Sequence, residues 1–227
     1  LVGRSIGAKK DTLARRYGII CTVMGAVFMG LTVALSVVIA VVLFMLTPFF
    51  ISSLFGKVIK SPMTLAVIEG LIRIAIFFIY IVAISQMKDI QRVFMYHGAE
   101  HKTINCIEHG AELTPENAAK YSRLHKRCGT SFLLIVFFTS MIFSILISLI
   151  PVFSNMITGN IASRMLYTAI SILFIPIIAG FSYELQQYTG RHDNLFTKIV
   201  SAPGLAFQKI TTKEPDDDQI EVAIAAL

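Results

Sequence analysis

The 227-residue sequence is poor in charged residues and in cysteine, and each shortage excludes a class of protein. Only 15% of the residues are charged, whereas 55% are hydrophobic and the mean hydropathy is +0.72. A soluble domain of this size could not cover so much apolar surface, which excludes a soluble globular protein. The cysteines number three and form no C-x-x-C pair, so reduced thiols are expected in place of a disulfide framework.

Internal repeats and low-complexity segments are lacking, and so are the marks of a cleaved signal peptide. The first twelve residues are basic and polar, and no small-residue cleavage site follows the first apolar run. The net charge of +6 does not predict a nucleic-acid partner, because most Lys and Arg residues flank apolar runs, where orientation in a membrane explains them.

Four apolar runs are long enough to cross a bilayer as helices, which takes about 20 residues each. They cover residues 17–46, 63–87, 130–150 and 164–188. The first is longer than a bilayer requires, and Pro48 is expected to end it. The run Gly129-Thr130-Ser131 is a start signal for the third, and Pro151 closes it. The predicted fold is therefore all-α, a single membrane domain over residues 1–227 with about four transmembrane helices.

The distribution of basic residues predicts the orientation. Sixteen of the 20 fall on one side: Arg4, Lys9, Lys10, Arg15, Arg16, Lys88, Arg92, Lys102, Lys120, Arg123, Lys126, Arg127, Arg191, Lys198, Lys209 and Lys213. Both termini and the central segment, residues 88–129, are therefore expected in the cytosol, with the protein in the inner cell membrane. The basic run 123–127 is expected to meet anionic lipid headgroups of the bilayer, with an anionic substrate as the alternative.

Two further helices are expected in the polar segments. Thr114 and Pro115 read as an N-cap and a first helical residue, and this helix should reach about Leu124. In the C-terminal tail, residues 203–204 predict a loop, and the acidic run 214–218 predicts the cap of a terminal helix that packs against another part of the chain.

The central segment carries the most informative motif, an H-x-x-E-H pattern made by His97, Glu100 and His101. Two histidines four residues apart share one helix face, where both can bind one metal ion, and the adjacent acid could act as a base on a metal-bound water. The inward face of this helix is predicted by a stripe of residues: Ile90, Phe94, His97, His101 and Ile104. Gly98 weakens the helix and indicates either a break or the close approach of another backbone.

Other metal-ligand types accompany this pair. His125 and Cys128 form an H-x-x-C just before the third span and could complete a tetrahedral zinc site. Glu184 lies inside the cytosolic end of the fourth span, where a carboxylate needs a metal ion or a cation as partner. The alternatives are ordinary interfacial histidines and a salt bridge from Glu184 to a loop Arg or Lys.

Glu69 and Arg73 are four residues apart within the second span and predict an ion pair that faces the bundle interior. A clamp between helices and a polar pathway are both compatible with such a pair. Cys106 is expected to be a small buried residue, with the metal site as the alternative, and Cys21 is expected in the core.

Three blocks of sequence carry a family resemblance: residues 97–103 (HGAEHKT), 122–132 (SRLHKRCGTSF) and 211–217 (TTKEPDD) followed by 221–223 (EVA). They resemble the YqhQ-like family of bacterial integral membrane proteins, and the resemblance runs from the first span to the end. The family is a domain of unknown function with members described as predicted metal-dependent enzymes. The resemblance therefore implies a membrane protein and adds to the expectation of a metal site.

The leading hypothesis is a membrane protein with one divalent metal ion, most simply zinc, at the cytosolic face. His97 and His101 would be ligands, completed by His125, Cys128 or Glu184, and Glu100 would be the base of a hydrolase acting on a peptide or lipid-like substrate. The alternatives are a small transporter or channel using Glu69, Arg73 and Glu184, and a scaffold without enzymatic activity. A homo-oligomer is compatible with each of these.

Overall fold

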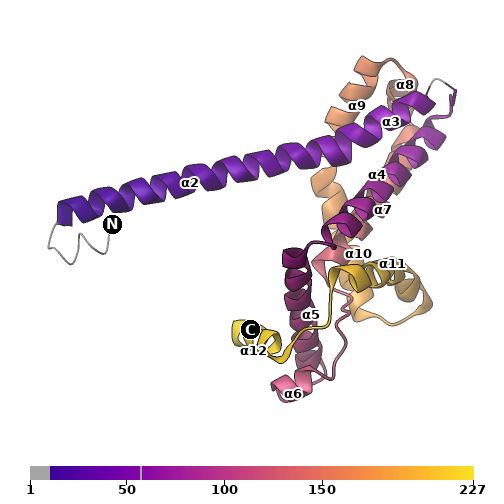
Figure 1. Ribbon diagram of the computed structural model, residues 1–227. Helices are drawn as coiled ribbons and strands as arrows, with labels where there is room; N and C mark the ends of the chain where they lie inside the picture. Colours follow the sequence, from indigo (N-terminus) through magenta and orange to yellow (C-terminus); the bar gives the residue numbers. More distant parts are fainter. Residues whose placement is uncertain (1–10, 57) are drawn as a thin grey trace. The chain divides into compact units, whose positions relative to one another are not determined.

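The computed structural model describes residues 11–56 and 58–227, which form helices and loops and contain no strand. The chain divides into two compact units, residues 1–47 and residues 48–227, and each is described by itself (Figure 1). Arg4, Lys9 and Lys10, three of the sixteen basic residues from which the orientation was predicted, lie outside the described residues.

The first unit contains one long apolar helix. Helix α2 covers Asp11–Val41 and is followed by a π-helical stretch, Val42–Leu46. Of its side chains, only that of Ala14 is buried, and Met24 and Phe28 are each 67% exposed. The expectation that Cys21 belongs to the core is wrong, because its side chain is exposed too. A helix that is apolar on all sides is compatible with a membrane span.

Pro48 does not end the first apolar helix, contrary to the sequence prediction. Helix α3 covers Thr47–Phe55, and Pro48 is its second residue, where a missing backbone N–H is tolerated. The backbone N–H of Thr47 bonds to the carbonyl of Val42, so the turn before the proline is widened into a π-helix that accommodates it.

In the described part of the chain, three helices are long and apolar enough to cross a membrane: Asp11–Phe55, Pro62–Ile84 (α4) and Gly129–Ser148 (α7). The predicted fourth span is a bent pair, α9 (Ile161–Leu173) and α10 (Ile175–Arg191), with an angle of 49° between them. Pro176 lies in the first turn of α10, where it lacks the N–H that would continue the helix. The all-α fold with three or four apolar helices is thus confirmed.

The other described helices are not both long and apolar enough to cross a membrane: α5 (Lys88–Glu108), α6 (Pro115–Ala118), α8 (Pro151–Thr158), α11 (Leu195–Thr211) and α12 (Asp217–Ala226). Pro151 begins α8, as its closing role for the preceding helix implied, and Thr114 caps α6 by accepting from the N–H of Asn117. The loop predicted at residues 203–204 is wrong, because both lie within α11. A Cβ atom at Gly204 would lie 2.7 Å from the Ser131 hydroxyl oxygen, so glycine allows α11 to pack closely on α7. This packing outweighs the low helix propensity of glycine.

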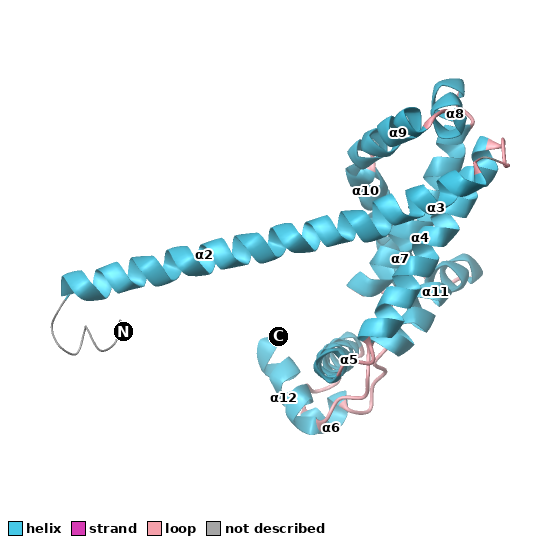
Figure 2. Ribbon diagram, turned by 45° about the horizontal axis from the view of Figure 1, so that its top comes forward, coloured by secondary structure: helices cyan, strands magenta, loops and turns pink. Residues whose placement is uncertain are grey.

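Within the second unit, α7 is the central helix and packs against α4, α10 and α11. At one end lie α8 and α9, and at the other end α5, α6 and α12 form a separate cluster (Figures 1 and 2). The core of that cluster consists of Ala99, Cys106, Ala118 and Ile220, each at most 2% exposed. The predicted acidic cap is present at Asp216, and the prediction that the terminal helix packs against the chain is confirmed, as is the burial of Cys106.

Candidate metal centre

Three potential metal ligands converge where α5 meets the start of α7. His97 and His101 lie one turn apart on α5, with ring centroids 4.4 Å from each other. Cys128 is the N-cap residue of α7 and is buried, as is His101, whereas His97 is half-buried. One ligand atom from each of the three lies within 4.8 Å of the others. The structure therefore brings together the two predicted histidines and one of their predicted partners.

The histidine rings are held by backbone carbonyls on the side away from the thiol. Nδ1 of His97 lies 2.9 Å from the Thr211 carbonyl, and Nδ1 of His101 lies 2.7 Å from the Arg123 carbonyl. A carbonyl can only accept, so each Nδ1 carries the hydrogen and donates it. The Nε2 atoms are left for the site, and that of His97 is 3.2 Å from the Cys128 sulfur.

Cys128 carries the negative charge of the cluster. Burial by itself would raise the pKa of its thiol, but hydrogen bonds with His101, His97 and Thr130 outweigh this effect and lower the pKa to about 5. Burial acts in the opposite direction on His97, whose pKa is nevertheless raised by the hydrogen bonds with Cys128 and the Thr211 carbonyl. At neutral pH the sulfur is thus a thiolate, the form that binds metals.

The loop between α6 and α7 is shaped by polar side chains of α5. The Lys102 ammonium donates to the carbonyls of residues 119 and 121, at 2.8 and 3.0 Å, and the Asn105 amide donates to those of residues 122 and 124, at 2.7 and 3.1 Å. These carbonyls would otherwise bond within a helix, which explains why α6 ends at Ala118 and not near Leu124 as predicted. Asn105 follows His101 by four residues, so the inward stripe could have indicated it.

Two buried glutamines fix the segment that leads to Cys128. Gln208 of α11 accepts from the N–H of His125 at 2.8 Å and donates to the carbonyl of the same residue at 2.7 Å. Gln186 of α10 donates to the Cys128 carbonyl at 2.8 Å. Helices α10 and α11 therefore hold the thiol in place through its backbone. Sequence reasoning missed both residues, since a glutamine in an amphipathic helix carries no signal of its partner.

Gly98 lets the C-terminal tail cross α5 at the site. The N–H of Lys213 donates to the Phe94 carbonyl at 2.8 Å, and a Cβ atom at position 98 would lie 2.1 Å from the Lys213 carbonyl oxygen. The helix is unbroken there, so the close approach of another backbone, one of the two readings of Gly98, is confirmed. This crossing places the Thr211 carbonyl against His97.

The other predicted ligands lie outside this cluster of three. Nε2 of His125 is 3.2 Å from a carboxylate oxygen of Glu108, and its ring centroid is 5.8 Å from that of His101. Burial by itself would raise the pKa of Glu108, but the combined effects of His125 and Arg127 outweigh it and lower that pKa. Glu100 and Glu184 are exposed, and over the described part of the chain neither joins the three converging donors.

The chain is similar to one protein family and to a bacterial protein. The family model described as "Protein of unknown function (DUF1385)" matches residues 8–227. A protein of Bacillus subtilis (strain 168), described as "Uncharacterized protein YqhQ", is 37% identical over 182 residues, which are 80% of this chain and 54% of the relative. The chain thus spans about half the length of the curated relative it matches. No solved structure matches the chain.

Proposed function

The chain belongs to the DUF1385 family, and from that starting point we propose that it is an integral membrane protein that binds one divalent metal ion, zinc, through His97, His101 and Cys128. The observation that carries the proposal is that both Nδ1–H groups donate to backbone carbonyls. The two Nε2 atoms can then bind the same ion as the Cys128 thiolate. Histidines that bind metals are oriented in this way by partners of the other ring nitrogen.

The donor set and its spacing fit zinc. Imidazole nitrogen and thiolate sulfur are the ligands that zinc prefers, at about 2.0 to 2.1 Å and 2.3 Å, which places neighbouring donors of a tetrahedral site about 3.5 Å apart. The distance of 3.2 Å between His97 Nε2 and the Cys128 sulfur is close to that value. Little movement of the side chains would be needed to close the site around an ion.

Three protein ligands leave a fourth position, which is the arrangement of catalytic zinc sites. Zinc held in this way would supply a Lewis acid and a water activated for hydrolysis. Glu100 is the candidate proton acceptor, because it precedes His101 and its charge contributes to the raised pKa of His97. We propose hydrolysis of a peptide or lipid-like bond at the cytosolic membrane face. The basic residues of the central segment and of the tail support this location of the site.

Metal content tests the proposal directly. Purified wild-type protein should contain about one zinc ion per chain by elemental analysis, and the double variant His97→Ala/His101→Ala should contain close to none. His109→Ala is the matched control, since that histidine is exposed at the end of the same helix and bonds to the Asn105 carbonyl instead. Equal and negligible metal in all three proteins would refute the zinc site.

A second measurement distinguishes a zinc ligand from a free nucleophile. In a Cys21→Ser background Cys128 is the reactive thiol to follow, because its pKa is lowered and it keeps 5% exposure, whereas Cys106 has none. Zinc should protect Cys128 from alkylation, and a chelator should restore the reaction. If zinc gives no protection while the alkylation is fast, the pair of His97 and Cys128 acts as a thiolate nucleophile without metal.

A further inference from the structure

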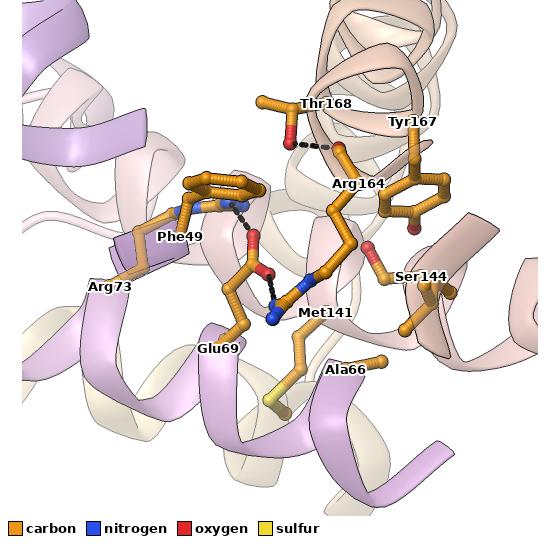
Figure 3. Close-up of a pocket in the computed structure, with 11 residues that line it drawn as sticks. Phe49, Ala66, Glu69, Arg73, Met141, Ser144, Arg164, Tyr167 and Thr168 are labelled. Carbon is orange, nitrogen blue, oxygen red and sulfur yellow. Dashed lines mark hydrogen bonds and ion pairs between the residues drawn. The ribbon is translucent and has the colours of Figure 1, made fainter. Parts of the chain in front are cut away.

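A second polar cluster lies inside the membrane-spanning part of the protein, toward the end opposite the metal site. Glu69 on α4 lies about 10 Å along the helix from its start at Pro62. Its carboxylate is 3.1 Å from a guanidinium nitrogen of Arg73, which confirms the predicted pair. Arg164, from the first turns of α9, joins at 3.9 Å. Figure 3 shows Glu69 between the two arginines.

Arg164 is the member that sequence analysis missed, and it is the most buried of the three. Its side chain is 7% exposed, compared with 18% for Glu69 and 21% for Arg73. One of its nitrogens donates to the Ser52 hydroxyl at 2.8 Å, and its guanidinium carbon lies 5.2 Å from the centre of the Phe49 ring. A hydrogen bond and an aromatic face therefore hold the buried guanidinium of Arg164 in place.

The charges that line this pocket do not balance. The pocket is lined by the two arginines, by Glu69 and by apolar residues such as Phe49, Met141 and Ile157. One carboxylate faces two guanidiniums, so these three side chains carry a formal net charge of +1. Such a charge is costly within a membrane unless an anion compensates it.

The pocket also has room and hydrogen-bond donors for an anion. Its volume is about 20 Å³, and a single water molecule needs about 10 to 15 Å³ measured in this way. The hydroxyl groups of Ser144 and Tyr167 line it beside Arg164, as Figure 3 shows. The space suits one compact ion.

We infer that this pocket is a binding site for one small monovalent anion of the size of chloride, held by Arg164 and Arg73 and limited in affinity by Glu69. The anion neutralises the excess charge of the cluster. The site is independent of the proposed zinc centre, because the two lie at opposite ends of α7, about 20 Å apart along the helix.

A chloride titration of the purified protein tests the inference. The thermal unfolding midpoint is followed in detergent as gluconate is replaced by chloride at constant ionic strength. The wild-type midpoint should rise and saturate. Arg164→Gln should weaken chloride binding at least tenfold, whereas Glu69→Gln, which removes the competing carboxylate, should tighten it at least threefold. Lys209→Gln removes an exposed positive charge outside the pocket and should leave the titration unchanged.

The two opposite changes keep the test decisive. If Arg164→Gln does not fold, the comparison of wild type with Glu69→Gln still decides, because tighter binding is expected only when the carboxylate competes with the anion. No chloride response in either protein would overturn the inference. Stabilisation by phosphatidylglycerol but not by chloride would overturn it too, in favour of a lipid phosphate at the same arginines.

Discussion

The two polar clusters of this protein differ in charge, so one suits a cation and the other suits an anion. At the junction of α5 and α7, two imidazoles surround a thiolate, and the three donor atoms suit a cation that displaces the protons of their hydrogen bonds. Around Glu69, two guanidiniums surround one carboxylate, and the cluster presents hydrogen-bond donors that suit an anion. Each cluster is completed by residues from different helices, so the fold, more than any local motif, determines what each can bind.

The clusters also differ in how their side chains are held. The histidines and Cys128 are positioned largely through backbone groups. The carbonyls of Thr211 and Arg123 accept from the two histidine rings, and the Cys128 carbonyl accepts a hydrogen bond from the Gln186 side chain. The pocket is positioned by side chains that contact one another, with Ser52 between Arg164 and Glu69. A metal site needs fixed donor geometry, and backbone anchors provide it.

The largest effect is expected from the thiolate. Cys128→Ser should lower zinc affinity by at least about 100-fold, because loss of a ligand costs more than loss of an outer hydrogen-bond partner, which costs roughly 10- to 100-fold. Competition with a chromogenic chelator measures the affinity. Cys106→Ser is the matched control, since Cys106 bonds to the Glu112 carbonyl and should be dispensable for zinc. An unchanged zinc affinity in Cys128→Ser would show that Cys128 is not a ligand and that this cluster is not a zinc site.

The reactivity of Cys128 should follow its lowered pKa. In metal-free protein with Cys21→Ser, the alkylation rate should stay within about twofold between pH 7 and pH 6 and be lost as the pH falls through about 5. An ordinary thiol, with a pKa near 8.5, slows about tenfold over the same interval. Stopped-flow alkylation with glutathione as reference measures both. A Cys128 rate that parallels glutathione would show that the histidines do not stabilise the thiolate.

A smaller effect is expected from the crossing of the tail over α5. Gly98→Ala places a methyl group against the Lys213 carbonyl, so it should cost about 1 to 3 kcal/mol of unfolding free energy and weaken zinc binding as Thr211 moves away from His97. Gly180→Ala is the control, because a Cβ atom there meets nothing within 4 Å and should not destabilise the protein. Denaturation and zinc titration of both variants decide whether the backbone contact holds the site.

The sequence predicted those features that depend on neighbouring residues. Apolar length located α4 and α7 to within a few residues, the spacing of His97 and His101 predicted a shared face, and Asp216 was correctly read within the acidic cap. The three-residue step from His125 to Cys128 indicated that both could complete the metal site. The structure turns His125 toward Glu108, because an acidic partner lies there that spacing alone could not show.

Features that depend on partners far away in the chain could not be predicted from the sequence. Pro48 and Pro203 both lie within helices, although proline lacks the N–H that a helix needs. A π-helical turn accommodates Pro48, and the packing of α11 on α7 stabilises the helix that contains Pro203. The end of α6 depends on side chains of α5 that capture its carbonyls. Arg164 reads as the edge of a loop in sequence, and only the packing of α9 brings it to Glu69.

The smallest effect is an expected absence of coupling between the two clusters. Arg164→Gln should leave zinc affinity unchanged, and His97→Ala/His101→Ala should leave the chloride titration unchanged. Sites that share no residue and lie farther apart than about 10 Å act additively to within about 0.5 kcal/mol. The combined variant completes the cycle, with both ligands titrated in all four proteins. A coupling clearly above that value would show that charge or strain passes along α7, and the two clusters would then be parts of one polar pathway through the membrane.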